Sequence, residues 1–258
     1  MSTFGSLRPI PLSFWRNSLD QWTWRSFMIT LVLNQAIGPI IGMLVWTSVL
    51  PESAEVRAYF FILLVVQLMT VSYEDHTFCT SIFDGTIIDQ LLLPQPVIAD
   101  AFGVNLSLRF WHTIFGLPIV AAVAFAVGLR LDPTDLLLAV PALILAGILR
   151  FLFTIAIAIT AFWTERATAL VSLASVVTGM LGGAAAPIFL LPSGLADLGR
   201  LLPFWPMLGM PGEIAAGVLT GTQIAAGYVY QLAWLIIFGG LVALVWHRGL
   251  RRFTAVGA

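Results

Sequence analysis

Long apolar runs separated by short polar stretches recur along the chain. Six of these runs come close to the roughly 20 residues that an α-helix needs to cross a bilayer. They predict an all-α, polytopic membrane protein with six transmembrane helices, formed by a single domain over residues 1–258. We place the spans at residues 27–50, 56–73, 110–128, 136–163, 167–191 and 227–246.

The segment before the first span, residues 1–26, contains an amphipathic pattern. Leu12, Trp15, Leu19 and Trp22 recur at helical spacing, with polar residues mostly on the other side. A helix with one apolar face and tryptophans typically lies in the plane of the membrane surface. We therefore expect an N-terminal amphipathic helix on the cytoplasmic surface.

Residues 192–226 combine apolar side chains with many prolines and glycines. They are too apolar for a free loop and too interrupted for a span. Short helices that dip into the outer leaflet fit this composition, provided that protein shields their backbone polar groups. We expect an outer re-entrant segment of broken helices before the last span.

The placement of arginines predicts the orientation. Cytoplasmic segments of membrane proteins carry an excess of basic residues, and arginines cluster before the first span and after the last. Both termini are therefore expected in the cytoplasm, which an even number of spans allows. The arginines assigned to the inside are Arg8, Arg16, Arg25, Arg109, Arg166, Arg248, Arg251 and Arg252.

Composition limits the possible functions. The chain is 59% hydrophobic and 10% charged, its net charge is −1, and all its basic residues are arginine. A nucleotide-binding P-loop needs a lysine that reaches the phosphates, so if ATP drives this protein, another chain must bind it. No basic cluster is large enough for nucleic acid. Lysine-free usage is typical of a GC-rich bacterial genome.

Catalytic and metal-binding motifs are absent from the sequence. The histidines are scattered over different elements, and no zinc-protease, nucleophile-elbow or paired-cysteine motif occurs. One stretch holds five residues that could in principle bind a metal, but their spacing fits no ligand pattern: Glu74, Asp75, His76, Asp84 and Asp89. A solvated acidic loop is the simpler interpretation. We predict a protein that is not an enzyme and has no catalytic site, metal site or cofactor.

The loop after the second span, residues 74–109, is long for a helical bundle and is therefore expected to be functional. Thr86 and Asp89 have the spacing of a capping box that starts a helix, and Pro94 would end that helix. Resting on lipid and docking on a partner protein are equally compatible with this short helix. Its apolar stripe consists of Ile87, Ile88, Leu91 and Leu92.

Polar residues inside predicted spans are costly and often functional. Asn34 and Gln35 lie in the first span and Arg150 in the fourth, and we consider them candidates for a translocation path. Arg150 could instead extend toward the membrane surface. We assign no acidic residue to a span, which argues against an ion-coupled secondary transporter.

Two glycine pairs have a spacing that lets helices approach closely. Gly38 and Gly42 lie in the first predicted span, and Gly179 and Gly183 in the fifth. The spacing alone does not distinguish packing within the chain from contact with a second chain.

Three stretches together resemble a known family. FDGTIIDQLLLPQP follows the second span, FWTERATAL opens the fifth, and LLPFWPMLGMPGEIAAG precedes the last, with the terminal WHRGLRRFTAVGA adding to the match. They are similar to the type-2 ABC exporter permeases, in particular the six-span subunits that pair with a drug-resistance-like ATPase. The resemblance covers nearly the whole chain. It departs at Gly85-Thr86-Ile87, where Gly-x-Leu is usual, and at the final Gly-Ala, where Gly-Gly is expected.

The resemblance implies a permease subunit of an ATP-driven transporter. Its partners would be two cytosolic ABC ATPase subunits and a second permease subunit, identical or homologous. The helix near Asp84–Leu93 would be the coupling helix seated on the ATPase. The first and fifth spans would meet their partners across the dimer axis, which favours an interface role for the four glycines. The coupling residues would be Asp84, Gly85, Thr86, Ile87, Ile88, Asp89, Leu91, Leu92 and Pro94.

The resemblance also implies a location and a mechanism. The protein would lie in the bacterial plasma (inner) membrane, in contact with lipid and not with nucleic acid. It would export an amphipathic or hydrophobic substrate by alternating access. The competing hypotheses are an ion-coupled secondary transporter and, with less support, a membrane-embedded enzyme.

Overall fold

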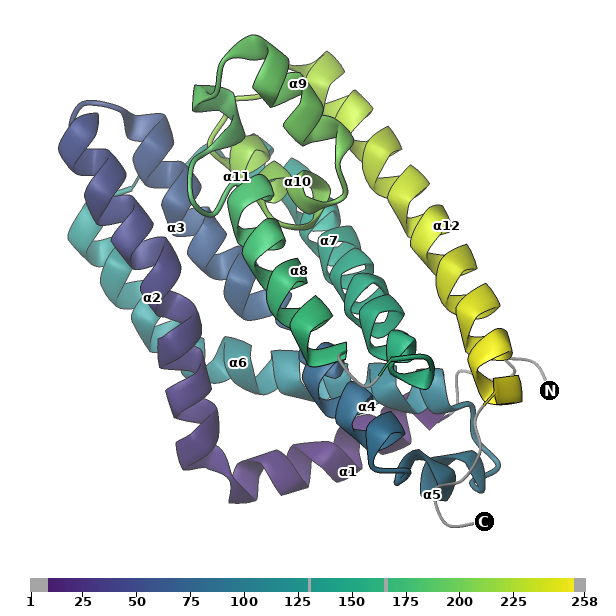
Figure 1. Cartoon of the computed structure of the whole chain (residues 1–258). Coiled ribbons are helices and arrows are strands. Elements are labelled where there is room, and N and C mark those ends of the chain that lie inside the picture. The colour runs from purple at the N-terminus through teal and green to yellow at the C-terminus, as the bar shows by residue number, and fades with distance from the viewer. Residues whose placement is uncertain (1–8, 130, 165–166, 253–258) are drawn as a thin grey trace.

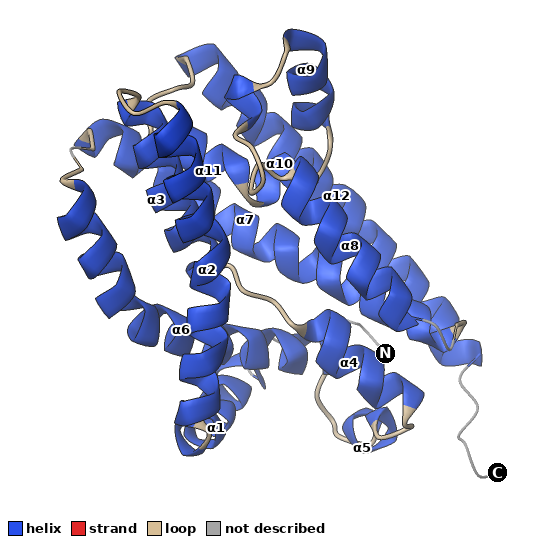
Figure 2. Ribbon diagram, turned by 60° about the vertical axis from the view of Figure 1, so that its left-hand side comes forward, coloured by secondary structure: helices blue, strands red, loops and turns tan. Residues whose placement is uncertain are grey.

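The structure is a computed structural model that describes residues 9–129, 131–164 and 167–252. Within these ranges every regular element is a helix (Figures 1 and 2). The prediction of an all-α fold is therefore confirmed. Of the arginines used for the orientation, Arg8, Arg166 and the side chain of Arg252 lie outside the described part.

Five helices among the described residues are long and apolar enough to cross a membrane. This confirms a polytopic helical membrane protein. A sixth apolar helix, α8 (Ala167–Leu181), is shorter. The five long candidates are α2 (Arg25–Val49), α3 together with α4 (Ala54–Met69 and Glu74–Phe83), α6 (Val97–Val127), α7 (Pro133–Ile159) and α12 (Gly221–Arg252).

The fifth predicted span, residues 167–191, is a helix only as far as Leu181. The chain leaves the helix at Gly183, whose φ of +95° is a backbone conformation that glycine adopts at little cost. A short 3₁₀ helix, η2 (Ile188–Leu190), follows. Gly183 therefore does not share a helical face with Gly179, and the spacing argument is wrong for this pair.

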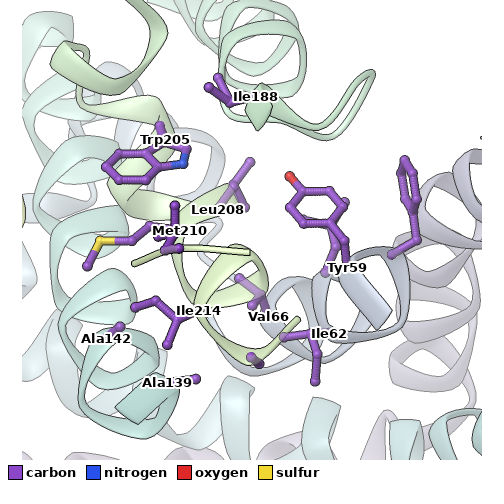
Figure 3. Close-up of a cluster of buried hydrophobic side chains, with 14 of the residues drawn as sticks. Tyr59, Ile62, Val66, Ala139, Ala142, Ile188, Trp205, Leu208, Met210 and Ile214 are labelled. Carbon is purple, nitrogen blue, oxygen red and sulfur yellow. The ribbon is translucent and has the colours of Figure 1, made fainter. Parts of the chain in front are cut away.

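Short broken helices precede the last span, as predicted. They are α9 (Ser193–Leu201), α10 (Phe204–Met207) and α11 (Gly209–Ala215). Figure 3 shows residues of α10 and α11, among them Trp205 and Ile214, packed against α3 and α7 in the largest apolar core. Protein, rather than lipid, therefore surrounds these two helices.

Hydrogen bonds from buried polar side chains hold this broken segment to the spans. Gln231 of α12 donates to the carbonyl oxygens of Ala142 (2.9 Å) and Pro206 (3.0 Å). Tyr59 of α3 donates to the carbonyl oxygen of Gly183 at 3.0 Å. The irregular backbone at these points thus has partners inside the protein, as a membrane interior requires.

The second span is broken near its middle. α3 ends at Met69, residues 70–73 are irregular, and α4 begins at Glu74. The predicted span 56–73 therefore ends at this break, and the loop predicted from residue 74 begins as a helix.

The third span begins much earlier than predicted, at Val97 instead of residue 110. Its first turns pack against α1 (Pro9–Thr23). Asp100 and Ser107 of α6 are buried in this contact, whereas Asn105 is buried against the chain after α3. These polar residues made the segment resemble a loop, but the helix buries them against neighbouring helices instead of water.

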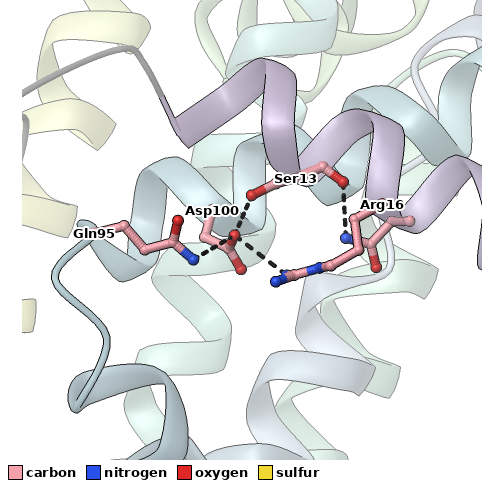
Figure 4. Close-up of polar contacts among 5 residues, drawn as sticks. Ser13, Arg16, Gln95 and Asp100 are labelled. Atoms are coloured by element: carbon pink, nitrogen blue, oxygen red, sulfur yellow. Dashed lines mark hydrogen bonds and ion pairs between the residues drawn. The ribbon is translucent and has the colours of Figure 1, made fainter.

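Figure 4 shows how Asp100 joins three parts of the chain. Its Oδ1 accepts hydrogen bonds from the hydroxyl of Ser13 and from Nε2 of Gln95, the latter at 3.1 Å. It also forms an ion pair with Arg16 at 3.5 Å. The opposite face of α1, with Leu12, Trp15, Leu19 and Trp22, is exposed and free to lie in a membrane surface.

One end of the bundle collects the functional candidates outside the spans. α1, α4, α5 (Ile87–Leu91) and the C-terminal end of α12 lie at this end, whereas α9 lies at the opposite end (Figure 1).

Candidate functional site

α4 and α5 form a helical hairpin joined by Asp84, Gly85 and Thr86 (Figure 2). The backbone at Gly85 has φ +77°, and a Cβ built there would meet nothing within 4 Å. Glycine is therefore favoured at this turn by its backbone conformation and not by a lack of space.

The predicted capping box at the start of α5 is wrong. Thr86 has helical φ and ψ of −64° and −13°, and its side chain makes no cap. A capping residue normally adopts extended backbone angles so that its oxygen can reach the free N–H groups. The Thr86 hydroxyl instead donates to the carbonyl oxygen of Ser81 at 3.4 Å. α5 does end before Pro94, at Leu91.

The predicted apolar stripe of α5 faces two ways. Ile87 is fully buried in a cluster that includes Phe78 of α4 and Trp246 of α12. Leu92, in contrast, is 79% exposed. The hairpin and the two residues after it, called its tip below, therefore leave three apolar side chains exposed, those of Phe83, Leu92 and Leu93, together with Asp84 and Asp89.

α4 is firmly connected to the spans. It packs against α7, α8 and the 3₁₀ helix η1 (Thr160–Phe162). The rings of Phe78 and Trp246 lie 5.9 Å apart between α4 and α12. A displacement of the hairpin would therefore be transmitted to several spans at once.

A buried polar cluster lies at the break of the second span. The carboxylate of Glu74 accepts hydrogen bonds from Asn105 Nδ2 at 2.7 Å, Ser72 Oγ at 2.5 Å and Thr154 Oγ1 at 3.1 Å. These partners come from α6, the break and α7. Both oxygens of this carboxylate thus accept hydrogen bonds from the protein.

This cluster corrects two sequence-based interpretations. Glu74 and Asp75 are only 6% and 7% exposed, so they do not belong to a solvated loop. They also lie within the candidate span Ala54–Phe83, although we had assigned no acidic residue to a span. The signal in the sequence was two carboxylates directly after an apolar run. Their burial depends on Asn105 and Thr154, which are distant in sequence.

Arg109 bridges the break and α7. Its Nε donates to the carbonyl oxygen of Val71 at 3.0 Å, and its Nη2 donates to that of Gly147 at 2.7 Å. The guanidinium thereby satisfies backbone groups that the break and the close approach of α7 leave available. Arg109 is therefore a structural clamp.

A cavity of about 270 Å³ lies beside the break, between α2, α3, α4, α7 and α8. It brings together two of the three predicted path residues, Gln35 of α2 and Arg150 of α7. Asn34 is exposed and does not line it. The polar lining residues are Gln35, Gln67, Ser72, Tyr73, Asp75, His76, Arg150, Thr154, Ser175 and Thr178.

The four glycines of the predicted dimer interface occupy two kinds of environment. A Cβ on Gly42 would lie 2.5 Å from the ring of Phe60, and one on Gly183 would lie 2.2 Å from the Tyr59 hydroxyl. Both are therefore used for packing within the chain. A Cβ on Gly38 or Gly179 would meet nothing within 4 Å. Contact with a second chain stays a prediction.

The helical bundle, with its long apolar helices and its projecting hairpin, defines a polytopic helical membrane protein. A sequence profile described as ABC-2 family transporter protein matches residues 21–257, and the chain therefore belongs to that family. No curated protein and no solved structure gives a significant match. The family supports a permease subunit of an ABC transporter and not the ATPase. This confirms the resemblance drawn from the sequence.

Proposed function

We propose that the protein is the permease subunit of an ATP-driven exporter, and that a separate cytosolic ABC ATPase docks on the α4–α5 hairpin. The observation that carries the proposal is the exposed apolar tip at Leu92, on a hairpin that Ile87 anchors to the spans. An exposed apolar surface beside charged groups is typical of a protein contact. A firmly packed hairpin can pass motion from such a contact to the membrane helices.

The proposed assembly contains two ATPase subunits and a second permease, identical or homologous. The end of the bundle with α1, α5 and the last turn of α12 would face the cytoplasm of a bacterial cell (Figure 1). The arginines at this end support that orientation, because basic residues are enriched on the cytoplasmic side. Among them are Arg16, Arg25, Arg248 and Arg251.

The cavity that contains Gln35 and Arg150 would belong to the translocation path. Its polar lining and the apolar surfaces of the surrounding helices suit an amphipathic substrate. Alternating access would expose it first to one side of the membrane and then to the other.

The buried carboxylate of Glu74 is the feature that an ion-coupled secondary transporter would use. Its hydrogen bonds to Ser72, Asn105 and Thr154 favour a structural role instead. Family membership also favours ATP as the energy source. Transport that continues without ATP but collapses with the ion gradient would support the secondary transporter.

A charged tip tests the coupling role. Leu92→Asp should abolish co-purification with the ATPase and substrate-stimulated ATP hydrolysis, because a desolvated carboxylate opposes an apolar contact. The permease itself should still fold, since Leu92 packs against little. Leu198→Asp is the matched control, a 56% exposed leucine on α9 at the opposite end of the bundle. If the Leu92→Asp variant bound the ATPase and showed substrate-stimulated ATP hydrolysis as the wild type does, α5 would have no coupling role and would only rest on the membrane surface.

A cysteine at the tip tests the topology. Asp89→Cys, in a Cys79→Ser background, should cross-link to the ATPase and react with membrane-impermeant reagents only from the inside. Asp89 is exposed, and Cys79 is buried in α4, so the new thiol is the accessible one. Labelling from outside the cell would refute both the orientation and the docking role.

A further inference from the structure

The cavity beside the break contains two ionic side chains that the protein leaves without an ion pair. Arg150 makes one hydrogen bond, from Nη1 to the Thr70 hydroxyl at 3.2 Å. No carboxylate of the described residues lies within 4.0 Å of its guanidinium nitrogens. Asp75 accepts one hydrogen bond, from the His76 backbone N–H at 3.1 Å. Both side chains line the cavity.

Neighbouring residues with the same charges make more hydrogen bonds with the protein. Glu74 precedes Asp75 and accepts three hydrogen bonds, and Arg109 donates two hydrogen bonds to backbone carbonyls. Neither Glu74 nor Arg109 lines the cavity. Glu74 and Arg109 thus make five hydrogen bonds around the break, whereas Asp75 and Arg150 make one each and face the cavity.

An unsaturated charge inside a membrane domain is costly unless another group compensates it. Arginine has five N–H donors in a planar fork that matches a carboxylate or a phosphate. Four of those of Arg150 have no hydrogen bond in the described chain. An aspartate that faces the same cavity suits an ammonium group. The two charges therefore fit a ligand that carries both an anionic and a cationic group.

Other polar groups also line the cavity. The Thr178 hydroxyl is buried and makes no hydrogen bond among the described residues. Gln35 and Gln67 also line the cavity and are half-buried. A buried polar group without a partner usually marks an unseen water or ligand. These groups could bind the neutral polar atoms of the same ligand.

The volume limits the size of that ligand. At about 270 Å³ the cavity lies just below the roughly 300–1,000 Å³ of sites for drug-sized molecules. A small polar head group therefore fits inside it, and the apolar part of an amphipathic molecule would extend beyond it.

We propose that the cavity binds a zwitterionic group, with a phosphate or carboxylate on Arg150 and an ammonium on Asp75. This group would be the polar end of the transported substrate, a statement that rests on the function proposed above. The shared chemistry could come from a zwitterionic lipid head group or from a small free zwitterion.

The first test uses three probes on the purified full-length permease, co-isolated with its partners, in nanodiscs of anionic lipid. Calorimetry should show binding of phosphoethanolamine, with inorganic phosphate and ethanolamine each binding at least about tenfold more weakly, because each satisfies only one of the two charges. If inorganic phosphate or ethanolamine alone bound as tightly as phosphoethanolamine, the proposal would be overturned. It would also be overturned if phosphoethanolamine bound neither in these nanodiscs nor in the phosphatidylethanolamine nanodiscs described below.

Charge-removing variants test the assignment of each residue. Arg150→Gln should bind phosphoethanolamine no more tightly than ethanolamine. Asp75→Asn should bind phosphoethanolamine no more tightly than inorganic phosphate. A merely structural role would weaken all probes alike, which is the result that would refute the assignment. Arg57→Gln and Asp197→Asn remove charges far from the cavity and should bind like the wild type. If a variant does not fold, the three-probe comparison on the wild type still decides.

Nanodiscs of a second lipid composition distinguish a lipid head group from a small free zwitterion as the ligand. In nanodiscs of phosphatidylethanolamine, a lipid head group in the cavity should block free phosphoethanolamine, whereas a site for a free zwitterion should still bind it. The proposed function can fail separately. Zwitterion binding without ATP-driven transport would refute the exporter alone, and ATP-driven transport without zwitterion binding would refute this inference alone.

Discussion

Glu213 carries its carboxylate inside the broken segment before the last span, with none of the side chain exposed. Neither of its oxygens accepts a hydrogen bond of normal geometry. The polar groups that face it are the guanidinium of Arg200 on α9, the indole of Trp205 on α10, the hydroxyl of Tyr59 on α3 and the backbone N–H groups of Ile188 and Phe189. Burial raises the pKa of Glu213 to about 7, although the positive charge of Arg200 opposes the shift.

This carboxylate predicts a pH-dependent stability. Because the ordinary pKa is 4.5, the folded protein keeps a proton between pH 4.5 and about 7 that the unfolded chain has released. The free energy of unfolding should therefore fall as pH rises through this window, by about 3 kcal/mol. Glu213→Gln should remove most of this fall, so that its thermal unfolding temperature exceeds that of the wild type at pH 8 but not at pH 4.5.

Thermal unfolding in detergent between pH 4.5 and 8 provides the measurement. Asp197→Asn, an exposed acidic residue on α9, serves as the control and should follow the wild type. A Glu213→Gln variant less stable than the wild type at pH 8 would show that the charged form is the stabilised one.

Single residues show where sequence reasoning reached its limit. Gln35 and Arg150 could be selected because a polar group inside an apolar run is visible in the sequence. Glu74, Asp75 and Glu213 could not, because a carboxylate next to a glycine, a proline or the end of an apolar run normally lies in solvent. Only the folded contacts show that these three are buried.

At the scale of elements, α1 depends on a close approach to α6. A Cβ on Gly103 would lie 2.7 Å from the carbonyl oxygen of Ile10 and 2.7 Å from Cβ of Ser13. The hydroxyls of Ser18 and Ser107 share a hydrogen bond of 3.0 Å across the same contact. Gly103 therefore leaves room for α1 to pack closely on the first turns of α6, and the contacts of Asp100 hold it there.

Gly103→Val should displace α1 from α6. Adding a branched side chain to a closely packed contact costs about 1–3 kcal/mol. We expect faster proteolysis within α1 and changed fluorescence of Trp22, whose ring lies 5.2 Å from that of Trp111 on α6. Gly239→Val is the control, since a Cβ at Gly239 on α12 meets nothing within 4 Å. Equal protection of α1 in both variants would show that this contact does not hold it.

The helices that could be predicted closely are those whose ends lie near the ends of an apolar run. α12 covers the span expected at residues 227–246, and α2 and α7 cover those expected at 27–50 and 136–163 except for the last one and the last four residues. The break after Met69 and the early start of α6 could not be predicted, because both depend on polar side chains that pair between helices. The hydrogen bond from Asn105 to Glu74 joins residues 31 positions apart. A pair so far apart produces no recognisable pattern within a short stretch of sequence.

At the scale of the whole molecule, α2 and α8 each keep an apolar face that no other part of the described chain covers. In lipid such a face is ordinary, so exposure alone does not indicate a partner. The glycines carry more information, because a small residue with free space around it allows a second helix to approach closely. The exposed apolar residues on these faces include Leu33, Ile37, Ile41, Leu173, Val176 and Met180.

The glycines therefore make the proposed permease dimer testable. Gly38→Leu should leave the fold of the monomer intact, because a Cβ there meets nothing within 4 Å, and should abolish dimers by separating the two helix backbones. Gly42→Leu should instead destabilise the monomer, since its Cβ would lie 2.5 Å from the ring of Phe60. Gly239→Leu and Gly240→Leu place the same side chain at open positions of α12 and should dimerise normally.

Native mass spectrometry from nanodiscs can count permease subunits in each variant, and thermal unfolding reports whether the monomer is intact. Gly179→Leu is read by the same two measurements and not by transport, because Gly179 also borders the cavity. A folded Gly38→Leu protein that dimerises like the wild type would exclude α2 from the interface at this position. Loss of dimers in the two α12 variants alone would move the interface to α12, the other long helix with open glycines.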